Sequence, residues 1–146
     1  MPKSKIHILD YGGGAGSTYI DCFKAFSSVG MESVEYYIYD FPETMRVGEE
    51  IFSKYRGIVT NKLYNVSFVD DISKINSIDI VHLGRVLQYI PNYSEVIKSI
   101  IEMSPNYFYI TDNFMGLHPT FATVQVNMIG RRMAYWIFQL EEIISL

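Results

Sequence analysis

The spacing of hydrophobic positions changes from one segment of the chain to the next, and the changes predict alternating strands and helices. Short apolar runs rich in β-branched and aromatic residues predict strands, and apolar residues three or four positions apart predict helices. The predicted strands are Ile6–Leu9, Ser33–Asp40, Leu63–Val69, Ser77–Leu83 and Tyr107–Thr111, and the predicted helices are Ser17–Gly30, Glu43–Arg56 and one that begins near Asn92.

This alternation of strands and helices indicates the fold class. Repeated strand–helix–strand units imply a parallel sheet with right-handed crossovers. We therefore expect an α/β, Rossmann-like, doubly wound sheet, mainly parallel, with strand order 3-2-1-4-5 and Ile6–Leu9 in the centre. The 146 residues are the size of one domain, so we expect a single domain over 1–146.

Four glycines, Gly12, Gly13, Gly14 and Gly16, follow the first predicted strand. A turn of this kind lets the backbone approach a ligand closely, and open α/β sheets bind ligands at this edge. A phosphate-binding Walker loop is excluded because no lysine follows the glycines. The dinucleotide fingerprint fits less well, because Ser17 occupies the place of its third glycine.

The pattern Asp-x-Gly-x-Gly-x-Gly, on Asp10, Gly12, Gly14 and Gly16, resembles motif I of class I S-adenosylmethionine-dependent methyltransferases. S-adenosylmethionine has no phosphate but carries an ammonium group, so a carboxylate beside a glycine turn suits it. The alternative is a glycine turn that only reverses the chain.

A second segment, Asp79–Pro91, is similar to a segment of the same superfamily, and its position relative to the glycine motif agrees with that superfamily. The resemblance implies that Leu83 and Gly84 lie beside the cofactor and that Gln88 lies near its methionine end. His82 falls within the predicted strand, where a hydrogen-bonded core histidine is the more frequent case.

The other predicted strands also end in carboxylates. Asp40 follows the second strand, where it can accept hydrogen bonds from both ribose hydroxyls, although Pro42 makes a helix cap the alternative. The resemblance implies that an acidic residue after the third strand contacts the adenine amino group. The sequence does not choose between Asp70 and Asp71 for this role. For each of them the alternative is an aspartate in a solvated turn. The expected cofactor-binding residues are Asp10, Tyr11, Gly12, Gly14, Gly16, Asp40, Phe41, Asp70, Asp71, Leu83, Gly84 and Gln88.

A closer resemblance is to a group of methyltransferase-like proteins, of unassigned substrate, encoded near surface-polysaccharide and similar biosynthetic genes. Segments typical of that group are found here at Gly12–Gly16, Asp40–Pro42, Val86–Tyr89, Thr123–Gln125 and Tyr135–Phe138. The chain departs from it after the fifth strand, where Asp112–Met115 replaces the group's basic residue and Thr-Pro.

Both ends of the domain are shorter than the superfamily's usual pattern. The superfamily has a helix before the first strand and a β-hairpin beside the fifth, whereas this chain begins at the strand. Only 34 residues follow Asp112, and Tyr135–Leu146 has the spacing of a helix. We therefore expect a domain truncated at both ends, with the C-terminal hairpin missing or incomplete.

The composition narrows the function classes. Twelve basic and 16 acidic residues give a net charge of -4, which argues against a broad nucleic-acid face. Cys22 is the single cysteine, so an internal disulfide or thiolate cluster is excluded. The histidines are far apart in the sequence, and we expect no metal site. With no signal peptide and no run of about 18 apolar residues, we expect a cytoplasmic protein with no membrane partner.

The function we expect is methyl transfer from S-adenosylmethionine to a small-molecule or sugar acceptor. The alternatives are a nicotinamide-dependent oxidoreductase, because Asp40 serves either ribose, and a non-catalytic module that binds S-adenosylmethionine or a partner. His118 is a candidate general base by position, although an ordinary loop histidine is the more frequent case. Arg131 and Arg132 are candidates for binding an anionic acceptor, or a solvated pair.

The fifth predicted strand is an aggregation hazard if it is left unpaired, because Tyr107–Ile110 is apolar and β-prone. Three arrangements would cover it. Thr123–Asn127 folds back antiparallel onto it, a second copy of the chain pairs there and also buries Tyr135–Phe138, or the natural protein extends past Leu146. We favour the second copy, and so a homodimer.

Overall fold

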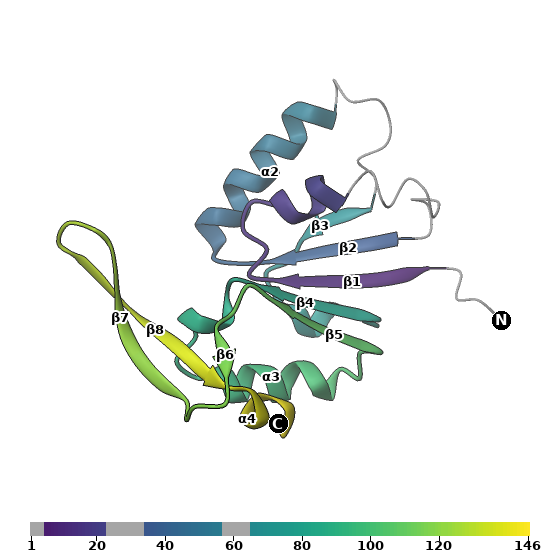
Figure 1. The fold of residues 1–146 in the computed structure, drawn as a ribbon. Helices are drawn as coiled ribbons and strands as arrows, with labels where there is room; N and C mark the ends of the chain where they lie inside the picture. Colours follow the sequence, from purple (N-terminus) through teal and green to yellow (C-terminus); the bar gives the residue numbers. More distant parts are fainter. Residues whose placement is uncertain (1–4, 23–33, 57–64) are drawn as a thin grey trace.

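The computed structural model describes residues 5–22, 34–56 and 65–146 (Figure 1). In chain order, with η for a 3₁₀ helix, the elements are β1 (Ile6–Tyr11), a helix over 17–22, β2 (Val34–Tyr39), α2 (Pro42–Arg56), β3 (Val66–Phe68), η2 (Ile72–Lys74), β4 (Ile80–Gly84), η3 (Leu87–Tyr89), α3 (Tyr93–Glu102), β5 (Tyr107–Thr111), β6 (Met115–Gly116), β7 (Phe121–Met128), β8 (Arg131–Gln139) and α4 (Leu140–Ile144). The predicted helix Ser17–Gly30 and the predicted strand Leu63–Val69 each lie partly outside the described residues.

The central sheet confirms the predicted fold class. Its five strands lie in the order β3-β2-β1-β4-β5, and every neighbouring pair is parallel. The chain therefore has the Rossmann-like architecture, with β1 in the middle and the glycine turn at its carboxyl end (Figure 1).

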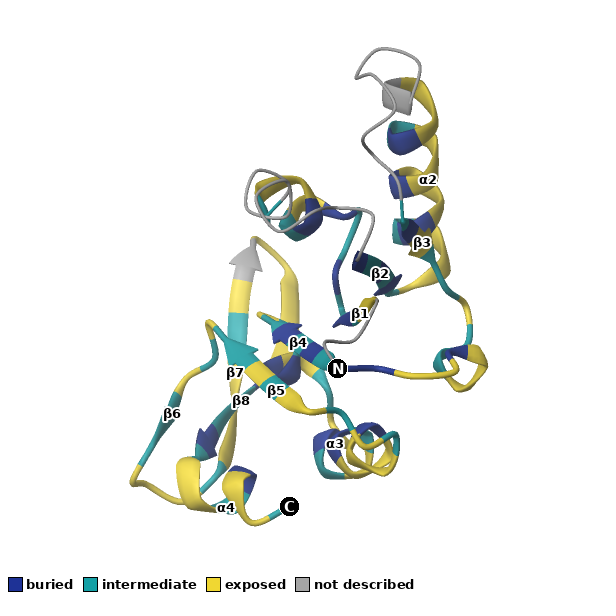
Figure 2. Ribbon diagram, turned by 90° about the vertical axis from the view of Figure 1, so that its right-hand side faces the viewer, coloured by how far each residue is buried: buried dark blue, intermediate teal, exposed yellow. Residues whose placement is uncertain are grey.

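Helices cover both faces of the sheet, with the helix over 17–22 and α2 on one side and α3 on the other (Figure 1). Successive side chains of β1 alternate between the two faces, so Ile8 packs in the core under α2, and Leu9 packs in the core on the α3 side. Figure 2 shows the buried residues along the inner surfaces of these layers.

The secondary structure of the C-terminal region differs from the sequence-based prediction. Residues 135–139, expected to be helical, belong to β8, and only α4 follows as a short helix. The buried side chains Tyr135 and Phe138 are three positions apart, which imitates a helical period, but they lie on a strand. Tyr135 packs on Tyr89, whereas Phe138 packs on Tyr93, so both faces of the strand are covered at its base.

One of the three arrangements considered for β5, in which Thr123–Asn127 folds back antiparallel onto it, does not occur. This segment belongs to β7, which pairs antiparallel with β8 in a separate sheet of order β6-β8-β7. Among the described residues β5 is the edge of the central sheet, and the β7–β8 hairpin that follows it lies in the other sheet. Figure 1 shows the β7–β8 hairpin projecting away from the central sheet.

A carboxylate anchors α4 to the rest of the fold. Glu142 accepts a hydrogen bond from the hydroxyl of Thr120 and another from Tyr93, at 2.5 Å. These two hydrogen bonds, that of Thr120 first, lower the pKa of Glu142. Burial, and then the hydrogen bond to Glu142, raise the pKa of Tyr93 to about 12, so its hydroxyl stays a donor near neutral pH.

We expect Glu142→Gln to lower the melting temperature at pH 7 by about 2–4 °C, the effect of roughly 1 kcal/mol in a domain of this size. Because the folded pKa of Glu142 is depressed, its stabilisation is complete above the unfolded pKa and disappears as pH falls through the folded value. Thermal unfolding measured from pH 7 to pH 2.5 should therefore show the two proteins converging in acid. A constant difference at all pH values would contradict this role.

Candidate functional site

The glycine turn after β1 combines packed and open positions. Gly12, Gly14 and Gly16 have φ of 76°, 61° and 91°, a region that favours glycine. A Cβ on Gly12 would lie 2.3 Å from Val86 Cγ2, and one on Gly16 would lie 2.8 Å from Phe52. A Cβ on Gly14 would meet nothing within 4 Å. The turn is thus held on both sides and open at Gly14.

Asp40 holds this turn from β2. Its Oδ2 accepts a hydrogen bond from the backbone N–H of Gly14 at 2.8 Å, and its Oδ1 accepts one from Phe41 N–H at 2.6 Å. Phe41 itself is 75% exposed. The backbone N–H of Gly12 donates to the carbonyl of Tyr39 at 2.7 Å. A half-exposed carboxylate therefore lies directly at the open part of the turn.

Asp10 lies beneath the turn and is 1% exposed. Its Oδ2 accepts from the hydroxyl of Tyr36 at 2.9 Å, and its Oδ1 lies 2.9 Å from Nδ1 of His82. A Cβ on Gly13 would lie 2.7 Å from this carboxyl group, so glycine is required there. Both oxygens of Asp10 thus face protein groups. The aromatic ring of Tyr11 packs on Tyr39 at 4.9 Å.

The end of β4 lies against the glycine turn through Val86. Leu83 is fully buried in the core, so only its backbone is available to a ligand. Gln88 is 3% exposed, and its Nε2 donates to the carbonyl of Arg85 at 2.9 Å. Its Oε1 is buried and has no hydrogen-bond partner. An unpaired buried acceptor is unusual in a folded protein.

The structure separates the two aspartates after β3. Asp71 caps η2 by accepting hydrogen bonds from the backbone and hydroxyl of Ser73, the hydroxyl having the larger effect in lowering the pKa of Asp71. Asp70 is exposed and lies 3.0 Å from Nζ of Lys74, a surface pair that constrains its side chain little.

The structure does not bring His118 to this edge. Its Nδ1 lies 3.1 Å from the carbonyl of Pro119, and its ring packs on Phe121. The loop between β6 and β7 lies beside α4, away from the glycine turn (Figure 1). Arg131 and Arg132 are exposed at the start of β8, at the tip of the hairpin.

Two residues at the carboxyl edge were missed by the sequence analysis. Arg85 and Asp112, directly after β4 and β5, both have φ of 56°, and Arg85 Nε lies 3.1 Å from Asp112 Oδ2. Left-handed conformations at non-glycine residues cost energy and gather at functional sites. No sequence signal indicated them, because neither residue type favours this conformation as strongly as glycine does.

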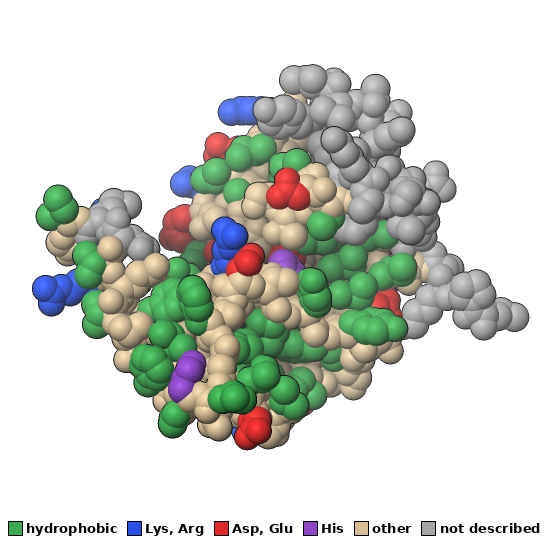
Figure 3. All heavy atoms as spheres, in the orientation of Figure 1, with side chains coloured by type: hydrophobic (Ala, Val, Ile, Leu, Met, Phe, Trp, Pro, Cys, Tyr) green, Lys and Arg blue, Asp and Glu red, His purple; other side chains and the backbone are tan. Residues whose placement is uncertain are grey.

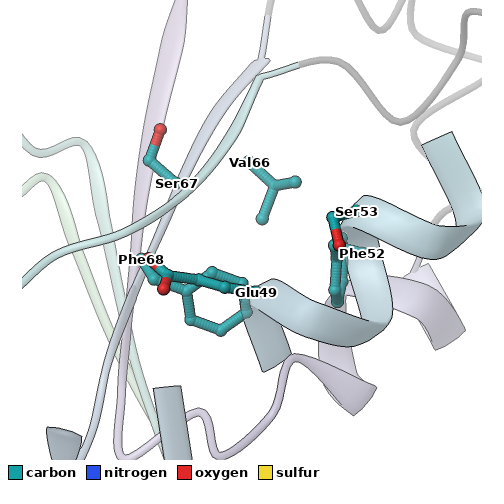
Figure 4. Close-up of a pocket in the computed structure, with 6 residues that line it drawn as sticks. All are labelled: Glu49, Phe52, Ser53, Val66, Ser67 and Phe68. Atoms are coloured by element: carbon teal, nitrogen blue, oxygen red, sulfur yellow. The ribbon is translucent and has the colours of Figure 1, made fainter. Parts of the chain in front are cut away.

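A separate hollow of about 410 Å³ lies between α2 and the edge strand β3 (Figure 4). Its lining residues are Glu49, Phe52, Ser53, Val66, Ser67 and Phe68. It lies at the β3 edge, whereas the glycine turn follows the central strand. In the part of the chain that the structure describes, no three His, Cys, Asp or Glu side chains group to hold a metal ion, and no helix is long and apolar enough to cross a membrane.

Comparisons with known proteins place the fold. No protein-family model matches the chain, and no curated protein matches it. Among solved structures it is similar to PKMT2 from Rickettsia typhi in complex with AdoHcy, with 13% identity and a TM-score of 0.56, over 82% of this chain and 22% of PKMT2. It is also similar to YcgJ from Bacillus subtilis, with 22% identity and a TM-score of 0.51, over 77% of this chain and 46% of YcgJ.

A third similar structure is the DszA carbon methyltransferase, with 23% identity and a TM-score of 0.51, over 68% of this chain and 26% of DszA. The chain spans less than half the length of each of these three proteins. At such identities the likeness shows the fold, and the chain has the Rossmann-like fold of methyltransferases such as DszA.

Proposed function

We propose that this chain binds S-adenosylmethionine at the glycine turn and transfers its methyl group to a small-molecule or sugar acceptor. The observation that carries the proposal is the turn itself, open at Gly14 and bordered by the carboxylate of Asp40, at the carboxyl end of the central strand. The fold is also that of PKMT2, which was solved with AdoHcy.

The residues at this edge fit such a cofactor. The unpaired buried oxygen of Gln88 suits a donor such as the ammonium of the methionine end. A Cβ on Gly14 would meet no protein atom within 4 Å, so the turn is open at the position where the ligand would approach the backbone. The carboxylate of Asp40 is an acceptor for ribose hydroxyls, and exposed Asp70 is an acceptor for the adenine amino group. Asp10 supports the turn from below.

S-adenosylmethionine, when bound, supplies a methyl group already activated on a positive sulfonium. The protein then has to align the acceptor with that methyl and exclude water, so positioning supplies much of the rate. The aromatic residues between η3 and the hairpin suit this task. The rings of Tyr89 and Phe114 both pack on Tyr135, at 5.4 and 6.1 Å, and the Tyr89 hydroxyl donates to Gln125.

This aromatic group supports the proposed class of acceptor. Phe114 is 66% exposed and Tyr89 is 38% exposed, so their rings offer flat apolar faces at the carboxyl edge. Such faces pack against planar small molecules and against the apolar faces of sugars. A sugar acceptor also agrees with the resemblance to the polysaccharide-associated group, which remains part of this proposal.

Calorimetric titration tests the cofactor assignment directly. The purified chain should bind S-adenosylmethionine and S-adenosylhomocysteine, and NAD⁺ should give no heat of binding under the same conditions. Binding of NAD⁺ without S-adenosylmethionine would favour an oxidoreductase. A folded protein that binds neither would contradict the proposal.

We also propose that a second copy of the chain covers the edge strand β5. Tyr107 and Tyr109 on this strand are 71% and 61% exposed, and Figure 3 shows hydrophobic side chains gathered over β5, β6 and the hairpin. Tyr135 and Phe138 are already buried within their own chain, so a dimer does not need them, in contrast to the sequence-based expectation.

Light scattering should therefore give twice the mass of the 16.9 kDa chain. Replacing Tyr107 and Tyr109 with lysine should give a monomer, because charged side chains block edge-to-edge pairing of strands. A monomeric wild-type protein at concentrations of about 100 μM would contradict the dimer, since obligate dimers bind far more tightly than this.

A further inference from the structure

A row of hydrogen bonds crosses four neighbouring strands beneath the glycine turn. The hydroxyl of Tyr36 on β2 donates to Asp10 on β1, and Nδ1 of His82 on β4 lies 2.9 Å from the other oxygen of Asp10. Nε2 of His82 lies 2.8 Å from Oγ1 of Thr111 on β5. The strands that carry these residues lie side by side in the sheet (Figure 1).

Chemistry gives each of these hydrogen bonds a direction. Burial, and then the charge of Asp10, raise the pKa of Tyr36, so its hydroxyl keeps its proton and donates. An ionised Asp10 only accepts, so Nδ1 of His82 carries a hydrogen. In the neutral imidazole Nε2 is then unprotonated and accepts the hydroxyl proton of Thr111. The oxygen of Thr111 keeps a lone pair for another donor.

The Thr111 end of the row reaches the carboxyl edge of the sheet. Thr111 pairs with Gly84 in the β4–β5 ladder, and a Cβ on Gly84 would lie 3.3 Å from Thr111 Oγ1 and 2.5 Å from the His82 ring. Glycine at position 84 therefore keeps the space beside both side chains. Two residues further on, Val86 contacts the glycine turn at Gly12, so the row and the turn share one edge.

We propose that Thr111 accepts the proton of the methyl acceptor, and that His82, held by Asp10, takes over the hydroxyl proton of Thr111. This inference rests on the proposed function and names the proton path for the same site. It replaces His118 as the candidate base.

Every proton and electron pair of the proposed step is accounted for. As the acceptor oxygen or nitrogen gains the methyl group, the sulfur–methyl bond breaks and its electron pair stays on sulfur, which becomes a neutral thioether. The acceptor's proton moves to Oγ1 of Thr111, and the hydroxyl proton of Thr111 moves to Nε2 of His82. The resulting imidazolium is paired with the carboxylate of Asp10 at 2.9 Å, which stabilises its charge in a largely buried site, where the two side chains are 15% and 1% exposed.

A binding comparison tests this without knowledge of the acceptor. Sinefungin carries an ammonium-bearing carbon where S-adenosylmethionine carries its methyl sulfonium. Its N–H groups therefore occupy the place of the transferred methyl and can donate to a proton acceptor beside the acceptor's position. S-adenosylhomocysteine lacks both groups. We expect the wild-type protein to bind sinefungin about tenfold more tightly than S-adenosylhomocysteine, the scale of one charge-assisted hydrogen bond.

Three variants examine the residues of the row. Thr111→Val keeps the shape of the side chain but loses the hydroxyl, and should abolish the preference for sinefungin. Thr111→Ser keeps the hydroxyl and should retain the preference. His82→Asn keeps an amide donor toward Asp10 but has no nitrogen at the Nε2 position, and should reduce the preference. The affinity for S-adenosylhomocysteine should stay within about twofold in both Thr111 variants, because β5 lies two strands away from β1 and its glycine turn.

Nitrogen NMR of the histidine-labelled chain gives a second reading. His82 should be the Nδ1–H tautomer when neutral, and its Nε2 signal should move on adding sinefungin but not on adding S-adenosylhomocysteine. A preference unchanged in Thr111→Val, or an Nε2–H tautomer, would overturn the relay while leaving cofactor binding intact. Failure of the wild-type protein to bind S-adenosylhomocysteine would instead overturn the proposed function, and the relay with it.

Discussion

Replacing Asp40 with alanine is expected to weaken the binding of S-adenosylmethionine by about 1.5–3 kcal/mol, roughly 10- to 150-fold in Kd. The carboxylate lies at the open side of the glycine turn, where its oxygens accept hydrogen bonds from Gly14 and Phe41. Each oxygen has lone pairs left for ribose hydroxyls. The variant loses both the acceptors for the ribose and the hydrogen bond that holds the turn.

Asp40→Asn separates these two losses. The asparagine keeps one oxygen that can accept from the Gly14 N–H but loses the charge and one acceptor. The affinity of Asp40→Asn for S-adenosylmethionine should therefore fall between those of the wild type and Asp40→Ala. Glu50→Ala is the matched control, because Glu50 is an exposed carboxylate in the middle of α2. Titration calorimetry measures the affinities, and circular dichroism checks the fold. Wild-type affinity in a folded Asp40→Ala protein would contradict the ribose role.

The sequence predicted the central sheet well because its strands are strongly patterned. Each β-strand from β1 to β5 is a short run of apolar and β-branched or aromatic residues that ends in a polar or glycine-containing segment. The glycine turn was equally readable. Positions such as Gly12 and Gly14 need a left-handed backbone, and glycine is the residue that adopts it at little cost.

The hydrogen-bonded row under the turn was not predicted, because it depends on strand register. In the β1–β4 ladder Asp10 is the direct partner of His82, although the two are 72 residues apart in the chain. The prediction that His82 is hydrogen-bonded agrees with the structure, but its partners were not foreseen. Only the strand order together with the register could have brought Tyr36 and Thr111 into the same row.

The C-terminal hairpin was misread for a different physical reason. On an exposed, two-faced strand the alternation of apolar and polar residues is lost, and β8 has partly buried residues on consecutive positions, such as Trp136 and Ile137. The base of this strand packs on η3 and α3, whereas its far end projects from the molecule (Figure 1). Tertiary contacts therefore decided its structure, and local spacing did not.

We expect Phe138→Ala to lower the free energy of unfolding by about 3–5 kcal/mol, the cost of removing a large aromatic side chain from a packed core. Phe138 is 0% exposed, its ring lies 4.9 Å from that of Tyr93, and its backbone N–H donates to the carbonyl of Phe114 at 3.0 Å. The side chain thus joins β8 to α3 at the point where the hairpin leaves the domain. Urea unfolding followed by fluorescence measures the loss.

Val124→Ala is the matched control for this loss, because Val124 lies on the neighbouring strand β7 but is 61% exposed. It should cost no more than about 0.5 kcal/mol, as surface substitutions usually do. In Phe138→Ala the amides of β7 and β8 should also exchange hydrogen faster, whereas those of the central strand β1 should stay protected. Losing this local contact lets the hairpin open while the central sheet stays closed. A loss below about 1 kcal/mol in Phe138→Ala, or equal losses in the two variants, would show that the hairpin is not held by this contact.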